Sequence, residues 1–562
     1  MKLLIRQYVA SLRESGELDA ILPDLLSELG YNVISRPMIG TRQYGVDIAA
    51  VGKDEDGERK LFLFSVKQGD LTRTDWEGTP QALRPSLDEI RTIYLRLRVP
   101  KEYQNLKTVI CICFGGEVRQ NVQDNVTGYI EEHTSDRLTF QQWNGDLISG
   151  LLIDGILKDS LVEPALRTSF QKAVAMVDEP AVCFEHFSEL VHQLCAKEAD
   201  FAKDRATIAR QLYLCLWVLF VWARDAENVE GPYQASELVV LHCWKLLQPS
   251  LGKSSKASRE VGEVFNEIVE LHFAIFDQLV SEKILPHVDK LHAISTAVGS
   301  SSPVDVNLKL FDLAGRIALH GLWKLWLASG DECLPAVRDD WNDEQVQDLA
   351  QKLVLLARNN PALLSPMQDA QSIDIALGLM FLTMQKDWQP AAINWVEALT
   401  QQIIFAFRTH ARYPTIQQSY RELLYHPRER TDEYRQEQTA GSTLIPLLSL
   451  WATRLGNAKT AQDLADFTEK YLAHCNCQLW LPDEDSEEHV YLRADEHGAM
   501  LNGVPITPDG DAAMEMIQEE CSVSPHFPAL SAIEMGHWPI LLLACRHHRL
   551  PVPPQLWIGL LS

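Results

Sequence analysis

An aspartate and a lysine near the amino end of the chain have the spacing of residues that meet across two paired strands. Asp47 follows a Gly-Val pair, and Lys67 ends the apolar run LFLFSVK. Because side chains alternate between the faces of a strand, Ser65 and Lys67 point to one face, and pairing across the 53–60 turn can bring Asp47 near it. A carboxylate and an amine on one face, beside a helix that supplies another acid, can hold a divalent cation and activate water for phosphodiester cleavage.

The residue types suit a reaction that depends on Mg²⁺ or Mn²⁺. Such ions prefer oxygen ligands, which Asp47 can supply from its carboxylate and Val66 from its backbone carbonyl. Lys67 can orient the attacking water or offset the charge that develops on the phosphate. An exposed hairpin with an ordinary ion pair would show the same two residues. Lys67, however, ends a strand apolar enough to be buried, and a buried lysine needs a partner or a function.

The elements that must position these residues lie in the first 160 residues, where helical and strand patterns alternate. A turn around Asp54, Asp56 and Gly57 joins the two strands of the site. The order of elements predicts an α/β domain with a mixed sheet flanked by helices, ending near residue 160. Helices are expected at 18–29, 85–96, 117–133 and 147–157, and strands at 31–34, 46–51, 61–67, 108–114 and 138–141.

Beyond residue 160 the pattern is almost entirely helical, so the fold class is an α/β domain followed by a large, mostly α-helical region. A polar stretch at 426–442 is expected to be a loop that separates a helical region, 161–425, from a C-terminal helical region, 443–562. A lone hairpin is expected at 490–506, around an Asn-Gly pair. Amphipathic helices are predicted at 234–247, 259–285, 304–328, 343–358, 391–409 and 461–474.

Charge limits the ways in which the chain can bind nucleic acid. It contains 51 lysines and arginines against 77 acidic residues, a net charge of −26, of which the first 160 residues carry only −5. This balance excludes a broad electrostatic nucleic-acid binder, which needs a basic surface, but not a local basic cleft near the amino end. Arg36, Arg42 and Arg73 flank the proposed site and could contact phosphate. Trp76 fits packing better than base stacking.

Cysteine usage and hydropathy predict a soluble, cytoplasmic protein with no membrane contact. The 11 cysteines show no disulfide pattern, which favours a reducing compartment. The first twenty residues lack the apolar core and cleavage site of a signal peptide. The longest apolar run, 212–223, is too short to span a bilayer and predicts a buried helix.

The Gly30-Tyr31 pair after the first predicted helix, the GVD run ending at Asp47 and the FSVK run ending at Lys67 together resemble the PD-(D/E)XK nuclease superfamily, most closely its Mrr-like domains. Such domains place an acid on a helix, then Gly-Tyr and a strand, then Asp, then Glu- or Gln-X-Lys. The resemblance covers residues 10–155 and implies a restriction-endonuclease-like fold. It also implies metal-dependent hydrolysis of DNA, as in bacterial restriction or anti-phage systems.

Carried onto this sequence, the family pattern assigns the helix acid to Asp19, with Glu17 as a substitute. It also assigns a catalytic position to Ser65, where the family usually has Glu or Gln. Serine is a weak, uncharged metal ligand, so three alternatives stay open. The site recruits Asp19 or Glu17, Gln68 takes the position, or the domain has kept the fold and lost catalysis.

The sequence leaves three candidate functions. The first is a metal-dependent nuclease effector that cuts DNA and is regulated by the helical region through a protein partner or self-association. The second is a catalytically degenerate nuclease fold that acts as a scaffold or a nucleic-acid-docking subunit. The third is a helical adaptor whose first domain is an unrelated α/β fold.

Overall fold

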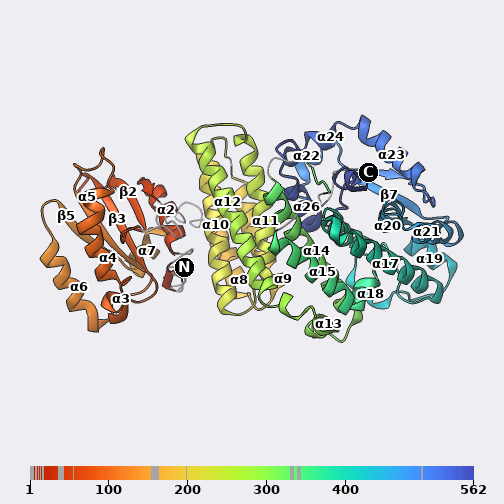
Figure 1. The fold of residues 1–562 in the computed structure, drawn as a ribbon, viewed down its shortest axis with the longest axis horizontal. Coiled ribbons are helices and arrows are strands. Elements are labelled where there is room, and N and C mark those ends of the chain that lie inside the picture. Colours follow the sequence, from red (N-terminus) through yellow and green to blue (C-terminus); the bar gives the residue numbers. More distant parts are fainter. Residues whose placement is uncertain are drawn as a thin grey trace. The chain divides into compact units, whose positions relative to one another are not determined.

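The computed structural model describes residues 5–6, 9–10, 12, 14, 18–35, 43–54, 56–152, 164–197, 199–329, 334–337, 343–494 and 498–561. The described chain begins with a sheet flanked by helices and continues mostly as helix (Figure 1). It divides into two compact units, residues 1–239 with 252–268 and residues 240–251 with 269–562. The first unit thus extends beyond the domain end predicted near residue 160, which itself lies outside the described residues.

The sheet of the first unit has five strands in the order β1-β2-β3-β4-β5. Strands β1, β2 and β3 are antiparallel neighbours, whereas β3, β4 and β5 run parallel, so the predicted mixed sheet is confirmed. The two central strands are buried along almost their whole length, as their continuous apolar runs require. The strands are β1 Asn32–Ser35, β2 Ile48–Lys53, β3 Arg59–Lys67, β4 Thr108–Phe114 and β5 Leu138–Trp143.

Helices flank this sheet, and the first of them ends as its sequence predicts. Gly30 adopts φ +84°, and the Tyr31 N–H donates to the Leu26 carbonyl at 2.9 Å, which closes the last turn. The expected 85–96 helix is one continuous helix that includes a π-helical turn. The helices are α2 Asp19–Glu28, α3 Arg73–Glu77, α4 Leu83–Glu89, η2 Ile90–Tyr94, α5 Leu95–Leu97, α6 Gln120–His133 and α7 Gly145–Leu152.

The rest of the described chain is mainly helical. Helix α10 (Ala202–Asp225) is long and apolar enough to cross a membrane. However, 83% of its most apolar 18-residue stretch is buried within the protein, which confirms the predicted buried helix. The further helices of eight or more residues are α8 Pro164–Ala175, α9 Pro180–Cys195, α11 Glu230–Leu247, α12 Lys256–Phe276, α14 Pro303–Ser329, α15 Glu344–Asn359, α16 Ser372–Thr383, α17 Gln389–Thr409, α20 Leu444–Arg454, α21 Ala458–Tyr471, α23 Asp511–Val523 and α26 Trp538–His548. Shorter helices are α13 Ala293–Ala297, α18 Tyr420–Tyr425, α19 Asp432–Gln438, α22 Ser486–His489, α24 His526–Ala529 and α25 Ser531–Glu534.

Two expectations for the carboxyl half are wrong. The 426–442 stretch is not a plain loop, because Thr431 caps α19 by accepting the Tyr434 N–H at 3.2 Å and the Tyr434 ring is buried. The lone hairpin at 490–506 does not form. Instead, β8 (Ala499–Asn502) pairs with β7 (Asn476–Leu481), and β6 (Gly441–Ser442) joins β7 in parallel. The apolar residues of β7 are buried, and this burial favours pairing with the distant strand.

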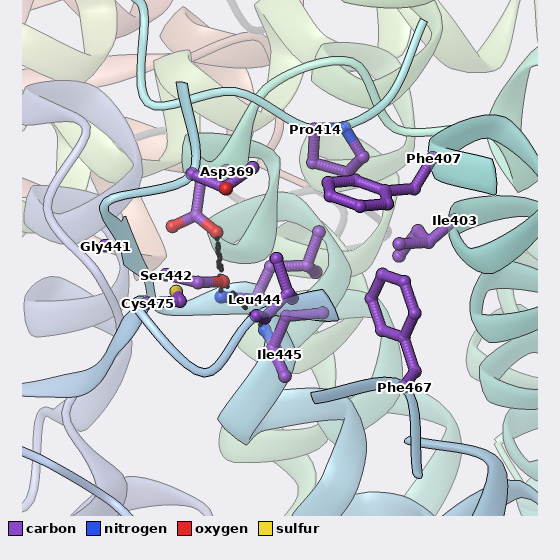
Figure 2. A pocket seen from close by; sticks show the side chains of 12 residues that line it. Asp369, Ile403, Phe407, Pro414, Gly441, Ser442, Leu444, Ile445, Phe467 and Cys475 are labelled. Atoms are coloured by element: carbon purple, nitrogen blue, oxygen red, sulfur yellow. Dashed lines mark hydrogen bonds between the residues drawn. The ribbon is translucent and has the colours of Figure 1, made fainter. Parts of the chain in front are cut away.

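A buried carboxylate fixes the start of helix α20 in the second unit. Asp369 accepts hydrogen bonds from the Thr443 N–H at 2.7 Å and from the Thr443 hydroxyl at 2.8 Å. It also accepts one from the Ser442 hydroxyl at 2.5 Å (Figure 2). Burial raises the pKa of Asp369, and these donors lower it. The neighbouring cavity holds about 20 Å³, enough for a single water molecule. This arrangement is a helix cap supplied by a residue distant in sequence.

Candidate active site

Asp47 lies at the junction between a sharp turn and strand β2. Tyr44 and Gly45 both adopt left-handed conformations, with φ of 54° and 80°, so the chain reverses just before Asp47. A Cβ atom at Gly45 would lie 2.3 Å from the backbone oxygen of Ser86 in α4, so only glycine fits this close approach. The glycine therefore sets the position from which the Asp47 side chain reaches β3.

Asp47 immediately precedes β2, and its side chain extends the hydrogen bonding between β2 and β3 by one position. The Asp47 N–H donates to the Phe64 carbonyl at 2.9 Å, and the Asp47 Oδ2 atom accepts the Val66 N–H at 2.7 Å. Because the N–H and C=O of a strand residue point to the same side, the Val66 carbonyl lies on the edge of β3 that faces Asp47. The carboxylate is thus held by the backbone N–H of Val66, the residue that precedes Lys67.

Lys67 is largely buried and pairs with an acid that the sequence reasoning did not select. Its Nζ atom lies 2.5 Å from Oε1 of Glu14, with the Lys67 side chain 12% exposed and the Glu14 side chain 42% exposed. Asp19, the expected helix acid, is the first residue of α2, and its negative charge raises the pKa of Asp47. Glu17 lies outside the described residues.

These acids and the lysine share one electrostatic environment. Burial raises the pKa of Asp47 to about 6, against an ordinary value of 3.8. The Val66 N–H and the Lys67 ammonium lower this pKa, whereas the negative charges of Glu14 and Asp19 raise it. The negative charges of Asp47, Glu14 and Asp19 outnumber the single positive charge of Lys67, an excess that a divalent cation would offset.

The donor set fits a hard cation that keeps much of its own water. Among the described residues, the Asp47 carboxylate accepts one hydrogen bond, from the Val66 N–H to Oδ2. Its Oδ1 atom is therefore available to a cation. No group of three or more acidic, histidine or cysteine side chains close enough to hold a metal occurs among the described residues. Mg²⁺ commonly binds through one or two carboxylates and completes its coordination with water and substrate phosphate. Asp47 and the Val66 carbonyl could supply such a partial ligand set.

Not every predicted residue belongs to this cluster. Ser65 is 1% exposed within β3, and Gln68 is exposed immediately after the strand. Arg73 is the first residue of α3, where its exposed side chain lies 3.4 Å from Glu77. Arg36 and Arg42 lie outside the described residues, so the structure places neither near the site.

Trp76 is a core residue, as the packing interpretation predicted. It is 1% exposed, and its ring meets the edge of Tyr129 at a centroid distance of 5.6 Å. A ring in this position cannot stack on a nucleic-acid base.

Glu14 is the residue that the sequence reasoning missed. Its signal was the spacing of Ile5, Val9 and Leu12, three fully buried apolar residues at helical intervals upstream of α2. A helical interpretation of that stretch would have added Glu14 to the candidate acids. Searching for the acid at the family's usual distance from Gly30 led to Asp19 instead.

Comparison of the chain with models of protein families, with curated proteins and with solved structures finds no match. The relation to the PD-(D/E)XK superfamily therefore remains a resemblance, carried by Gly30-Tyr31, Asp47 and Lys67.

Proposed function

We propose that this chain is a metal-dependent nuclease of the PD-(D/E)XK type that hydrolyses DNA in the cytoplasm, with Asp47 and Lys67 at its active site. The observation that carries the proposal is a half-buried carboxylate that accepts its hydrogen bond from a backbone N–H and not from the neighbouring ammonium. Asp47 is held by a backbone N–H, while the adjacent amine of Lys67 pairs with Glu14. A purely structural ion pair would join Asp47 to Lys67 directly, whereas perturbed carboxylates gather at functional sites.

The residues have separate roles in this proposal. Asp47 and the Val66 carbonyl would hold Mg²⁺ or Mn²⁺, with Asp19 close enough to contribute charge. The bound cation supplies Lewis-acid stabilisation of the phosphate and lowers the pKa of a bound water. Lys67 would orient the attacking water or offset charge on the phosphate. Glu14 positions Lys67 by accepting its hydrogen bond.

The helical region fits a regulatory role better than a substrate-binding one. Residues 161–562 carry a net charge of −21, which repels the DNA backbone and disfavours non-specific binding at rest. We propose that this region contacts a protein partner or a second copy of the chain and thereby controls cleavage. The assembly state of the full chain, measured by mass photometry with and without DNA, tests this part of the proposal.

A second candidate function is a catalytically degenerate scaffold or nucleic-acid-docking subunit. Ser65 favours it, because this buried hydroxyl stands where an active nuclease of the superfamily usually carries Glu or Gln. The exposed Gln68 or the acid Glu14 would have to compensate in an active enzyme.

Cleavage assays with the full chain separate the two functions. Supercoiled plasmid, linear duplex and single-stranded DNA are incubated with Mg²⁺ or Mn²⁺. We expect Asp47→Asn and Lys67→Met each to lower the cleavage rate by about 100-fold or more, the effect of removing one group that stabilises a transition state. Asp124→Asn and Lys101→Met, at exposed positions, are the matched controls. Metal-dependent cleavage that survives both site variants would overturn the proposal, as would the lack of cleavage of every DNA form.

A further inference from the structure

Helices α15 and α17 of the second unit border an open cavity of about 390 Å³. All its lining residues are apolar except Arg358 on α15 and Asn394 on α17. The volume falls within the range of small-molecule sites, about 300–1,000 Å³, and a mainly apolar lining with a few polar groups is typical of them.

The apolar wall of the cavity is pre-formed rather than loosely packed. The Trp395 indole N–H donates to the Leu363 carbonyl at 3.1 Å, and the Trp395 side chain is 6% exposed. Gly378 in α16 makes room for this ring, because a Cβ atom there would lie 2.5 Å from it. Leu353 and Leu382 are buried beside it. A ligand therefore meets a fixed surface and loses little affinity to reorganisation of the protein.

The polar rim of the cavity carries positive charge. Arg358 is exposed and forms no ion pair or hydrogen bond within the described ranges. No lining residue is acidic, and the next acid along α17, Glu397, already accepts a hydrogen bond from Gln401 at 2.9 Å. Guanidinium groups bind carboxylates through paired, charge-assisted hydrogen bonds.

We propose that this cavity binds a small amphiphilic carboxylate, such as a medium-chain fatty acid or an aryl carboxylate. The carboxylate accepts hydrogen bonds from Arg358 and from the amide of Asn394 at the rim. The apolar body lies against Trp395, Leu353 and Leu382. This site is separate from the nuclease residues, so the proposal does not depend on that activity.

Isothermal titration calorimetry of the full chain tests the assignment. The probes are decanoate, 2-naphthoate and the uncharged decanol. We expect at least one carboxylate to bind with a 1:1 stoichiometry and decanol to bind at least tenfold more weakly. Arg358→Ala should weaken carboxylate binding at least tenfold, the loss expected for one charged hydrogen bond. Arg421→Ala, an exposed arginine on α18, should leave the affinity unchanged.

Filling the cavity gives a second, independent test. Ala391→Phe and Ala398→Leu place larger side chains on the lining, and each should abolish binding of the carboxylate. Thermal unfolding of both variants checks that they fold, and either folded variant suffices. Failure of both carboxylates to bind would overturn the proposal. Equal binding of decanol, or binding that Arg358→Ala and the filling variants leave unchanged, would overturn it as well.

Discussion

Replacing Asp47 with asparagine separates the functional role of this residue from its effect on stability. Asparagine keeps the shape of the side chain and can still accept the Val66 N–H that Asp47 accepts at 2.7 Å. It removes the negative charge and replaces the Oδ1 oxygen with an NH2 group. We therefore expect Asp47→Asn to abolish metal-dependent cleavage and, at neutral pH, to raise the free energy of unfolding of the sheet.

The magnitude follows from the pKa of Asp47. Burial raises this pKa from 3.8 to about 6 in the folded protein. One pKa unit corresponds to about 1.4 kcal/mol, so ionising Asp47 at pH 7 costs the folded state at most about 3 kcal/mol. Between the ordinary pKa of 3.8 and the folded-state pKa of about 6, the folded state binds more protons than the unfolded state. The stability of the wild type therefore falls as pH rises through this window, whereas the asparagine variant does not titrate.

Hydrogen–deuterium exchange of peptides from β3, measured at increasing urea concentrations, reports the local free energy of unfolding. This local readout suits a chain of two units, for which a single unfolding transition is not expected. We expect a gain of about 1–3 kcal/mol for Asp47→Asn at pH 7 and almost none at about pH 4. The exposed control Asp124→Asn should stay within about 0.5 kcal/mol at both pH values. A loss of stability at pH 7, or an equal gain at both pH values, would show that the charge of Asp47 does not destabilise the folded sheet.

Three further predictions concern the same site. In the proposed mechanism the ionised form of Asp47 binds the cation, so at a metal concentration below saturation cleavage should fall as pH drops through about 6. A pH–rate profile that is flat between pH 5 and 7 under these conditions would contradict this. Glu14→Gln removes the partner of Lys67 and, since Glu14 is partly exposed, should lower the local unfolding free energy by about 1 kcal/mol and reduce cleavage. No change in either exchange or cleavage would show that the Lys67–Glu14 pair contributes to neither stability nor activity. Gly45→Ala should destabilise the sheet by about 2 kcal/mol or more, because alanine is strained at φ +80° and meets Ser86. Wild-type exchange rates in β2 and β3 of this variant would disprove the claim of close packing.

Much of the sheet domain could be predicted from the sequence, because its central strands are continuous apolar runs with clear turns between them. Strand β4 begins and ends where its apolar run does, and Gly57 adopts φ +77° in the expected turn between β2 and β3. The amphipathic helix predicted at 304–328 is α14, Pro303–Ser329. These elements are determined by residues close together in sequence.

The candidate site was only partly predictable, because its contacts join residues distant in sequence. Strand alternation suggested that Asp47 would approach Lys67, but not that its carboxylate would bind the Val66 N–H just beyond the end of β2. Glu14 lies 53 positions before Lys67, and spacing alone could not select it over Asp19. The lone hairpin predicted at 490–506 around the Asn-Gly pair was wrong for the same reason, because β8 pairs with β7, which lies earlier in the sequence.

Single-turnover nicking of supercoiled plasmid by the full chain with Mn²⁺ is the sharpest test of whether Asp47 and Lys67 form a metal-dependent active site. The rates of Asp47→Asn, of Lys67→Met and of the double variant are compared with the wild type. We expect metal-dependent nicking by the wild type and a large loss of rate in each single variant. The double variant should be no slower than the slower single variant, because the two residues act as a unit. Wild-type rates in both single variants, or no nicking by the wild type, would contradict it.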